Sequence, residues 1–282
     1  MERKGKKMLA GGGEGPFVSA SPPSPKPPSP TPYRGVGGEF EGRARELTSP
    51  GPLLKPKLRI CVPVVEATVN RARGRYQRAA RKGLWTEIRL DFLEEPTPDL
   101  QKLFRSLPGP VIATNRLATE GGRWTGTEAD RLNLLSEALN QGVTCLDVEL
   151  AADASFRREI WERRGKTRLM LSWHDFTGTP DAARLGVVLE EILAADADVV
   201  KMVALAREPA DNLRLLSLIP RAQAQGKDVI AFCMGPLGKW SRVAAPLLGS
   251  WLTFAPFSKQ GASAPGQLTV NDVKRLWQML RR

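Results

Sequence analysis

The sequence predicts an α/β protein built as a barrel of eight parallel strands, with a helix after most of them. Three observations support this prediction. From Leu58 onward, short apolar segments recur eight times, helical patterns separate most of them, and the whole repeat spans about 225 residues. That number of repeats and that length are typical of a (β/α)8 barrel, the TIM-barrel fold.

Eight segments are predicted to be strands because each is short, apolar and rich in β-branched residues, as buried parallel strands are. They are Leu58–Val65, Trp85–Phe92, Pro110–Asn115, Thr144–Leu150, Arg168–His174, Asp198–Leu205, Asp228–Met234 and Trp251–Pro256.

Helices are predicted between these strands, where apolar residues recur at a spacing of 3.6. They include Thr68–Lys82, Thr127–Gln141, Asp181–Ala195 and Pro209–Gln225. Thr127 stands three residues before Asp130, which is typical of a helix start. Gly83, Gly142 and Gly226 follow predicted helices, as C-terminal stops do. A doubly wound open sheet also alternates strands and helices, but no glycine-rich dinucleotide loop follows the first strand. We therefore favour the barrel.

Residues 1–56 differ from the rest of the chain. They contain 11 of the 23 prolines, several glycine-rich runs and few large apolar side chains. Such a segment lacks the material for a packed core. We predict a disordered Pro/Gly-rich N-terminal extension over residues 1–56 and a barrel domain over residues 57–282.

The composition narrows the possible partners. No apolar run approaches the ~20 residues that a membrane span needs, and the N-terminus has no signal-peptide pattern. Three cysteines lie in apolar, strand-like runs, as expected in the reducing cytoplasm. His174 is the sole histidine, so a multi-histidine metal site is excluded and we predict no metal.

The net charge of +12 raises the question of nucleic-acid binding. Residues 1–56 carry nine Lys/Arg against five Asp/Glu, and the other basic residues are scattered over predicted helices. Because no basic groove interleaved with aromatic residues is present, we expect no nucleic-acid partner. A basic surface would attract small anions instead.

Lys201 lies in the middle of a strand that is otherwise apolar. A buried ammonium is costly unless it is paired or neutral. One interpretation is a structural lysine that pairs with a carboxylate across the core. The other is a desolvated amine with a lowered pKa that attacks a carbonyl and forms a Schiff base. The lysine alone does not decide between them.

Other polar residues lie where strands end, which is the side on which barrels of this type carry their active sites. Glu87 and Arg89 share one face of the second strand because side chains alternate with a period of two. His174 ends the fifth strand, and Arg116, Arg242 and Ser263 lie in loops after the third, seventh and eighth strands.

Seven motifs follow one another along these strands in a fixed order. They are Glu87-x-Arg89, Arg116-x3-Glu120-Gly-Gly, Ser172-x-His174-Asp-Phe, Lys201-Met202, Met234-Gly-x-x-Gly-x-x-Ser241-Arg242, Gly249-Ser-x-x-Thr253-Phe-Ala and Ala262-Ser263-Ala-Pro-Gly-Gln267. In this order, the chain from Leu58 to about Leu280 resembles the type I 3-dehydroquinate dehydratases. Trp173 and Cys233 depart from the tyrosine and serine that are frequent in that family, but neither position carries the chemistry.

The resemblance implies a reaction and roles for residues. The enzyme would convert 3-dehydroquinate to 3-dehydroshikimate and water in the shikimate pathway, without a cofactor. Lys201 would form the imine, with apolar neighbours and nearby arginines favouring the neutral amine. His174 would act as general acid and base, and Glu120 would orient it. Relatives are commonly homodimers, so we expect a homodimer.

The resemblance also implies substrate-binding residues. Arg242 would bind the substrate carboxylate, while Glu87, Arg89 and Arg116 would bind ring hydroxyls. Arg116 and Glu87 could instead form a buried structural pair. Ser263 and Gln267 would belong to a loop that closes over the substrate. We expect Met202, Met234 and Phe254 to form apolar walls around the imine.

Two alternatives remain open from the residues. A class I aldolase or transaldolase barrel would also explain Lys201, although not the His-Asp and Ser-Ala-Pro-Gly-Gln motifs. A catalytically dead barrel that binds partners through its Pro-rich tail is the second, and Lys201, His174 and Arg242 argue against it.

Overall fold

The computed structural model describes residues 57–95, 98–106 and 108–281. The predicted extension over residues 1–56 lies outside these residues, so its disorder and its boundary stay predictions. No helix in the described part is both long and apolar enough to cross a lipid bilayer.

The described chain forms eight parallel strands in the order β7-β6-β5-β4-β3-β2-β1-β8. The strands are β1 (Ile60–Val64), β2 (Trp85–Arg89), β3 (Val111–Thr114), β4 (Cys145–Glu149), β5 (Arg168–Asp175), β6 (Val199–Leu205), β7 (Asp228–Met234) and β8 (Thr253–Phe254). All eight predicted strands are present, and the prediction of a (β/α)8 barrel is confirmed. The last strand is shorter than predicted.

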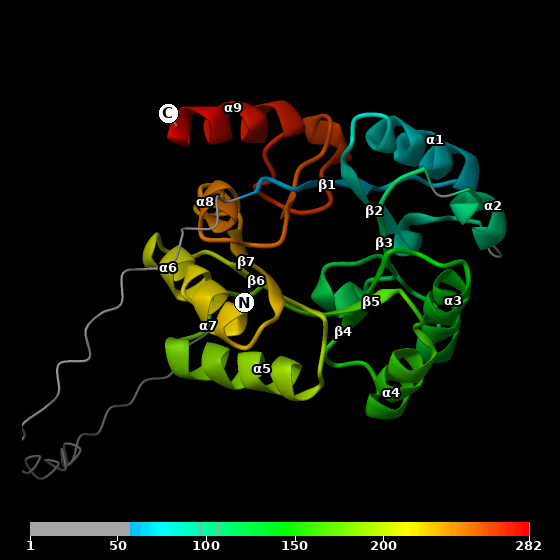
Figure 1. Cartoon of the computed structure of the whole chain (residues 1–282), viewed down its shortest axis with the longest axis horizontal. Coiled ribbons are helices and arrows are strands. Elements are labelled where there is room, and N and C mark those ends of the chain that lie inside the picture. The colour runs from blue at the N-terminus through cyan, green and yellow to red at the C-terminus, as the bar shows by residue number, and fades with distance from the viewer. Residues whose placement is uncertain (1–56, 96–97, 107, 282) are drawn as a thin grey trace, which may run out of the picture. The chain divides into compact units, whose positions relative to one another are not determined.

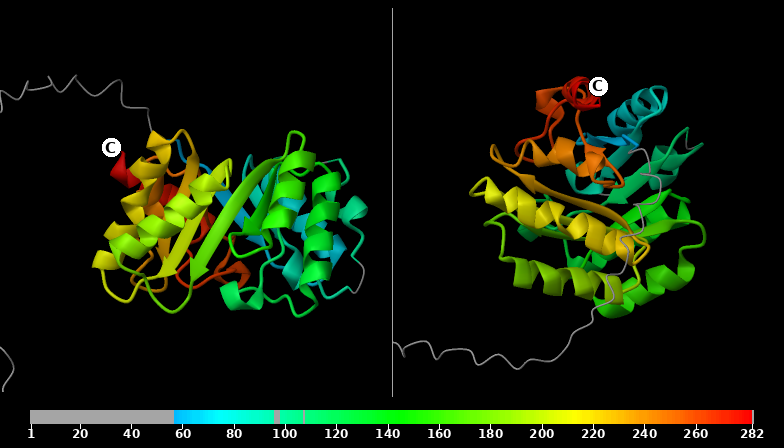
Figure 2. Two further views of the ribbon diagram at one scale, coloured as in Figure 1. Left: turned by 90° about the horizontal axis from the view of Figure 1, so that it is seen from below. Right: turned by 60° about the vertical axis from the view of Figure 1, so that its left-hand side comes forward.

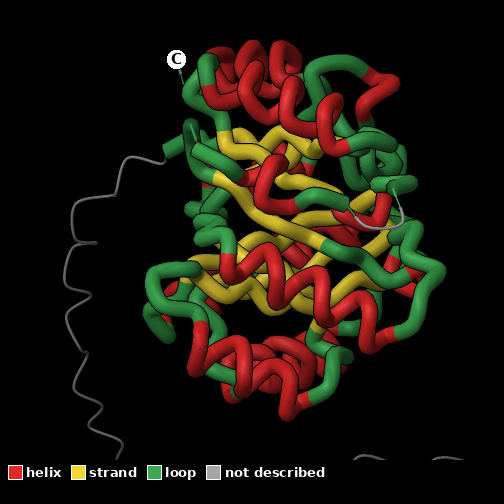
Figure 3. The backbone as a smooth tube through the Cα atoms, turned by 90° about the vertical axis from the view of Figure 1, so that its right-hand side faces the viewer, coloured by secondary structure: helices red, strands yellow, loops and turns green. Residues whose placement is uncertain are grey.

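The sheet closes almost completely on itself. β1 pairs with both β2 and β8, so the first and last strands lie side by side (Figure 1). β7 and β8 form no regular ladder, but the Trp251 amide donates to the Val229 carbonyl at 2.7 Å across this seam. Figure 3 shows the strands in the middle of the domain with helices outside them.

Helices follow most of the strands, as the sequence predicts. They are α1 (Val69–Ala80), α2 (Leu100–Phe104), α3 (Glu128–Asn140), α4 (Ala154–Arg163), α5 (Ala182–Ala194), α6 (Ala210–Leu216), α7 (Leu218–Ala224), α8 (Ser241–Leu247) and α9 (Val270–Leu280). The Thr127 side chain accepts from the Asp130 amide at the start of α3, which confirms that predicted start. The segment from α5 to α7 lies along the outer face of the sheet (Figure 2).

One predicted helix is wrong. The segment Pro209–Gln225 is two helices, α6 and α7, with Ser217 between them. Pro220 explains the break because its nitrogen carries no hydrogen for the carbonyl of Leu216, four residues earlier, and its ring crowds that carbonyl. The periodic apolar pattern continues through the break, so the pattern alone did not reveal it.

The alternation of side chains along the strands separates the two faces of the sheet. Val200 and Met202 of β6 are fully buried in the main core cluster, whereas Lys201 and Val203 line the cavity described below. The barrel therefore holds a polar layer at the end where its strands finish, above a large apolar core.

Candidate active site

A cavity opens where the strands end. Every site residue predicted from the sequence lines it. These residues are Glu87, Arg89, Arg116, Glu120, His174, Lys201, Arg242, Ser263 and Gln267. Residues that are up to 180 positions apart in the chain thus meet in one pocket.

Lys201 is buried and faces this cavity from β6. Its Nζ lies 2.7 Å from Asp147 Oδ2, 3.4 Å from Glu87 Oε1 and 4.7 Å from the centre of the Phe254 ring. The pairing with carboxylates across the core is therefore present, and the same side chain also borders the cavity, where the Schiff-base interpretation stays a prediction. The nearby arginines that we expected border the same cavity, but the charged groups in direct contact with Nζ are carboxylates.

His174 and Glu120 form a hydrogen-bonded pair at the cavity wall, with 2.8 Å between Nδ1 and Oε2. Burial, with Arg116 and Lys201 nearby, lowers the pKa of His174 well below its ordinary value. Burial also raises the pKa of Glu120 to about 7, although Arg116 opposes that shift. The imidazole is therefore neutral near pH 7, and its partner carboxyl titrates there.

The turn that carries Glu120 depends on a glycine. Residues Ala118–Glu120 form a 3₁₀ turn that ends at Gly121, whose φ is 76°. A Cβ at Gly121 would lie 2.1 Å from the Phe176 ring, so a larger residue would displace Phe176 or the turn. The Glu-Gly sequence thus places the carboxylate beside the histidine.

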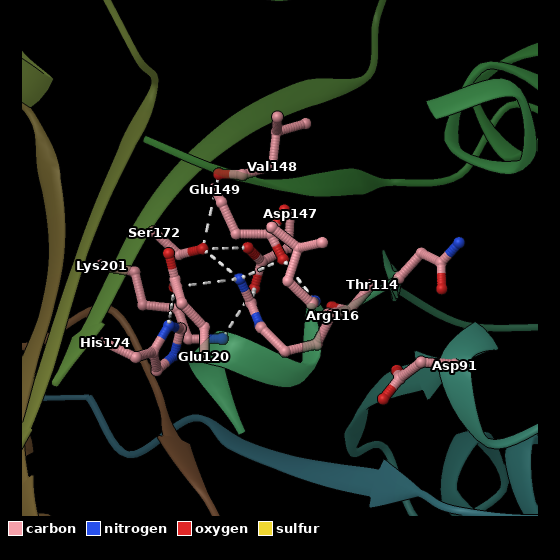
Figure 4. A network of polar contacts seen from close by, with 12 residues as sticks. Asp91, Thr114, Arg116, Glu120, Asp147, Val148, Glu149, Ser172, His174 and Lys201 are labelled. Carbon is pink, nitrogen blue, oxygen red and sulfur yellow. Dashed lines mark hydrogen bonds and ion pairs between the residues drawn. The ribbon is translucent and has the colours of Figure 1, made fainter. Parts of the chain in front are cut away.

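Arg116 lies at the centre of a network of acidic residues (Figure 4). It pairs with Asp147 at 2.6 Å and with Glu149 at 3.0 Å, and its Nη1 lies 3.8 Å from Glu120. It also donates to the Ser172 hydroxyl at 2.6 Å. Burial alone would lower the pKa of Arg116, but Asp147 and Glu149 hold it above its ordinary value, so the guanidinium is charged.

The buried pair of Arg116 with Glu87, kept open from the sequence, is wrong. Glu87 contacts Lys201 and accepts from the Thr114 hydroxyl at 3.2 Å, while Asp147 and Glu149 take its place beside Arg116. Sequence reasoning missed both acids. The signal was present, because Asp147-x-Glu149 sits in an apolar strand with the same two-residue spacing as Glu87-x-Arg89.

Arg242, at the start of α8, differs from the other arginines of the cavity. It is 1% exposed, and its Nε has no hydrogen-bond partner. Its Nη2 donates to the Pro265 carbonyl at 3.3 Å, and the guanidinium lies 4.6 Å from the centre of the Phe232 ring. Burial lowers its pKa to about 10, and no carboxylate of the described residues pairs with it. A buried cation without an anion is costly, and an anionic ligand would compensate it.

Arg89 is held by the end of its own strand. Its Nε and Nη2 donate to the two oxygens of Asp91 at 2.8 and 2.7 Å. This bidentate pair fixes the plane of the guanidinium at the cavity wall. Asp91 also accepts from the Arg123 amide at 2.9 Å, which attaches the loop after β3 to β2.

The loop after β8 lies over the cavity and is internally bonded. The Ser263 amide donates to Gln267 Oε1 at 3.0 Å, and Gln267 Nε2 donates to the Ser263 hydroxyl at 3.2 Å. The Gly235 amide donates to the Pro265 carbonyl at 3.2 Å. Gly266 has a φ of 79°, and a Cβ there would lie 2.3 Å from the Gly235 carbonyl oxygen. This close approach requires glycine.

The predicted apolar walls are partly correct. Met234 and Phe254 line the cavity, but Met202 does not. It neighbours Lys201 in a strand, so its side chain points to the opposite face and is buried there. Within the described residues, no group of three His, Cys, Asp or Glu side chains is arranged to hold a metal ion.

Comparisons with known proteins identify the family of this chain. A sequence model of the type I 3-dehydroquinase family matches residues 60–282. The 3-dehydroquinate dehydratase of Methanosarcina barkeri is 36% identical over 238 residues, covering 80% of this chain and 96% of that protein. That of Syntrophobacter fumaroxidans is 40% identical over 178 residues, covering 62% and 75%. The crystal structure of 3-dehydroquinate dehydratase from Geobacillus kaustophilus HTA426 matches with a TM-score of 0.71 and 29% identity, covering 80% of this chain and 91% of that one. The resemblance is confirmed, and the chain belongs to the type I 3-dehydroquinase family.

Proposed function

We propose that Lys201, His174 and Glu120 together catalyse the reaction of this family in the cavity. The chain is a 3-dehydroquinate dehydratase, a hydro-lyase of the shikimate pathway that converts 3-dehydroquinate to 3-dehydroshikimate and water. The proton to be removed lies beside a ketone and is only weakly acidic. An iminium in place of the ketone is a better electron sink, so a lysine serves the reaction.

The proposed first step is transfer of a proton from the Lys201 ammonium to a base of the cavity, after which the neutral amine attacks the C3 carbonyl. That proton then passes to the carbinolamine hydroxyl, which leaves as water and gives an iminium cation at Nζ. Burial alone would raise the pKa of Asp147, but Arg116 and Lys201 hold it well below its usual range, so this carboxylate stays ionised. At 2.7 Å from Nζ it would stabilise the positive charge of the iminium as it stabilises the ammonium.

His174 is proposed to move the protons. Its Nδ1 contacts Glu120 and the residue lines the cavity, so Nε2 is the nitrogen proposed to meet the substrate. A carboxylate at Nδ1 favours the tautomer with a proton there and a lone pair on Nε2. Nε2 takes the C2 proton and the electron pair moves into an enamine. The enamine then expels the C1 hydroxyl, to which His174 returns a proton, so that water leaves. Hydrolysis of the new iminium releases the product and the amine.

Glu120→Gln is expected to remove the acidic limb of the pH profile of kcat/KM. The pKa of Glu120 is about 7, so the ionised partner of His174 accumulates as pH rises through that value. Glutamine accepts the same hydrogen bond without a charge, and we expect kcat/KM to fall about 10- to 100-fold at pH 8. Initial rates between pH 5.5 and 9 test this. A limb that persists in the variant would assign the titration to another group.

The same substitution has a stability consequence. In the native protein Glu120 binds its proton more tightly than its ordinary pKa of 4.5 allows. Between about pH 4.5 and 7 the native state therefore binds more protons than the unfolded chain, and this carboxyl makes the free energy of unfolding fall as pH rises. Glu120→Gln should flatten that slope in urea unfolding.

Arg242 is the residue that indicates an anionic substrate. A buried guanidinium without a carboxylate partner shares a cavity with the proposed nucleophile and base. The substrate carboxylate would supply the missing anion, and the planar fork of arginine matches its two oxygens. This single observation links the cavity to an acid such as 3-dehydroquinate.

Arg242→Met is expected to raise KM about 10- to 100-fold, because hydrogen bonds to a charged group are lost. It should also raise the midpoint of thermal unfolding, since methionine removes an unpaired buried charge. Arg242→Lys keeps the charge without the fork and should give an intermediate KM. Steady-state kinetics and calorimetry test both. An unchanged KM in Arg242→Met would contradict the carboxylate role.

The remaining cavity residues are proposed to bind the substrate ring. Glu87 and Arg89 present polar atoms from β2, and Arg116 lies deeper, between its carboxylates. Ser263 and Gln267 would bind hydroxyls from the loop over the cavity and exclude water during the reaction. What supports these roles is that all five side chains border the same space as Lys201.

The alternatives to a dehydratase are less well supported. An aldolase or transaldolase explains Lys201 but not the matched family, nor the buried arginine. A catalytically dead scaffold would have no reason to keep Lys201, His174 and Arg242 in one cavity. The product is a conjugated enone, so the appearance of its strong ultraviolet absorbance in an assay with 3-dehydroquinate tests the proposal directly. Absence of product from folded enzyme would favour a scaffold.

We further propose a homodimer in the cytoplasm. The exposed large apolar side chains of the described residues all lie on α5, α6, α8, α9 and the loops beside α8, which are neighbouring elements. They are Val187, Leu213, Leu237, Trp240, Leu248, Leu276, Met279 and Leu280. Exposed apolar side chains on neighbouring elements are candidates for a subunit contact. Sedimentation of the wild type and of Leu213→Glu tests it, and a monomeric wild type would contradict it.

The three free, buried cysteines suit a reducing compartment. Binding no nucleic acid stays a prediction.

A further inference from the structure

Arg131 is a fully buried arginine that does not line the cavity. It belongs to the first turn of α3, on the outside of the barrel. Its Nη1 binds Glu149 Oε2 at 2.5 Å and donates to the Asn115 carbonyl at 2.8 Å. Its Nε and Nη2 each lie 2.7 Å from an oxygen of Glu128, a side chain that is 45% exposed. One guanidinium therefore joins the helix surface, the end of β3 and an acid inside the barrel.

Glu149 carries the connection inward. Its second oxygen, Oε1, lies 3.0 Å from Arg116 Nη1 and accepts from the Leu117 amide at 3.2 Å. Glu149 is fully buried, so its charge is balanced by the two arginines and not by water. Arg131 thus contacts Glu149, the acid beside Arg116, and the backbone carbonyl of Asn115, the residue that precedes Arg116.

From Arg116 the network divides into two branches, and the labelled side chains in Figure 4 show both. One branch runs through Asp147 to Lys201, with distances of 2.6 and 2.7 Å. The other runs through Glu120 to His174, with distances of 3.8 and 2.8 Å. Charges alternate in sign along the branch to Lys201, whereas the branch through Glu120 ends at the neutral imidazole of His174. The chain of contacts that begins at Arg131 ends at the two residues proposed to do the chemistry.

We infer that Arg131 is a positioning residue for the dehydration, which through Glu149 fixes the place of Arg116 between the Asp147–Lys201 pair and the Glu120–His174 pair. This inference rests on the roles proposed above for Lys201, His174 and Glu120.

The physical reason is the balance of charge around Glu149. Without Arg131, a buried carboxylate would depend on Arg116 and one amide, and Arg116 would be drawn toward it and away from Glu120. The charge of Glu149 would also be less compensated. The charged and titratable groups that face Glu120 are Arg116, Glu149, Asp147, Lys201 and His174. The positive charge of Arg116 lowers the pKa of Glu120, and the negative charge of Glu149 raises it. A weaker attraction by Arg116 and a stronger repulsion by Glu149 would therefore both raise the pKa of Glu120.

Arg131→Met is therefore expected to move the acidic limb of kcat/KM upward by roughly half a unit to one unit, and to lower kcat/KM at pH 7 about tenfold. Arg131→Lys keeps the charge and should leave the limb nearer to the wild-type position. Glu128→Gln is the matched control, because it removes the solvent-exposed partner of Arg131 and leaves the contact with Glu149 in place. It should not move the limb.

A double-mutant cycle sharpens the test. Arg131→Met with Glu149→Gln removes both charges, and we expect the limb to return toward the wild-type pH. If Arg131→Met lowers stability and rate but leaves the limb in place, Arg131 is only structural and the inference is wrong. If Arg131→Met does not fold, Arg131→Lys and Arg131→Gln are compared instead. An acidic limb at the same pH in both variants would exclude an effect of the Arg131 charge on the pKa of Glu120.

Glu120→Gln separates this inference from the function on which it rests. A limb that is lost in Glu120→Gln but unmoved in Arg131→Met contradicts Arg131 alone. A limb that persists in Glu120→Gln contradicts the role of Glu120, and the inference falls with it.

Discussion

Lys201→Ala is expected to abolish turnover of 3-dehydroquinate while the barrel stays folded. The substitution removes the amine that would form the iminium, and among the residues that the structure describes no other lysine lines the cavity. Loss of a covalent nucleophile costs roughly 10⁶-fold in other enzymes, so we expect no turnover above background. Steady-state rates measure the loss, and circular dichroism measures the fold.

The control for this prediction is a second lysine that also pairs with an aspartate but does not line the cavity. Lys227 also pairs with an aspartate, Asp196, at 2.6 Å, but it lies outside the cavity. Lys227→Ala should keep wild-type kinetics. Lys201→Met is a second variant that fills more of the vacated volume beside Asp147. Turnover near the wild-type rate in either Lys201 variant would overturn the Schiff-base mechanism.

His174→Ala is expected to slow turnover by about 10²–10⁴-fold or more, because one residue serves several proton transfers. The amine of Lys201 remains, so the variant should still form a covalent adduct with the substrate. Rate measurements and reductive trapping on the same sample separate the two effects. A variant that is slow but still trapped would place the histidine after imine formation.

The result that contradicts this role is equally clear. Full activity in His174→Ala would remove histidine from the chemistry, since His174 is the sole histidine of the chain. His174→Gln is a useful companion, because its amide keeps a polar group near Glu120 but cannot transfer a proton at neutral pH. We expect it to be as slow as the alanine variant.

Much of the fold was predictable because strands of a buried parallel sheet leave a strong apolar pattern. All eight strands were located, and the period of two correctly placed Glu87 and Arg89 on the cavity side. The ends of helices were also legible where a capping residue is local, as at Thr127. The break at Ser217 was missed because Pro220 acts on a carbonyl four residues away without interrupting the apolar pattern.

The site was predictable where a motif marked it and unpredictable where only packing did. Lys201, His174 and Arg242 stand in recognisable motifs, and the structure brings them into one cavity. Which groups surround Lys201 was not predictable, since the partners Asp147 and Glu87 come from two other strands. The sequence predicts only that Arg131 belongs to a helix. Its contact with Glu149 depends on how α3 packs against the barrel, which no local pattern encodes.

The Schiff base at Lys201 is tested most directly by mass spectrometry of the protein mixed with 3-dehydroquinate and borohydride. Reduction of the iminium would fix the ligand on the enzyme as a stable amine. We predict an adduct of ligand mass on the peptide that contains Lys201 and no adduct in Lys201→Ala. Active wild-type enzyme that is never trapped, or an adduct on a different lysine, would contradict it.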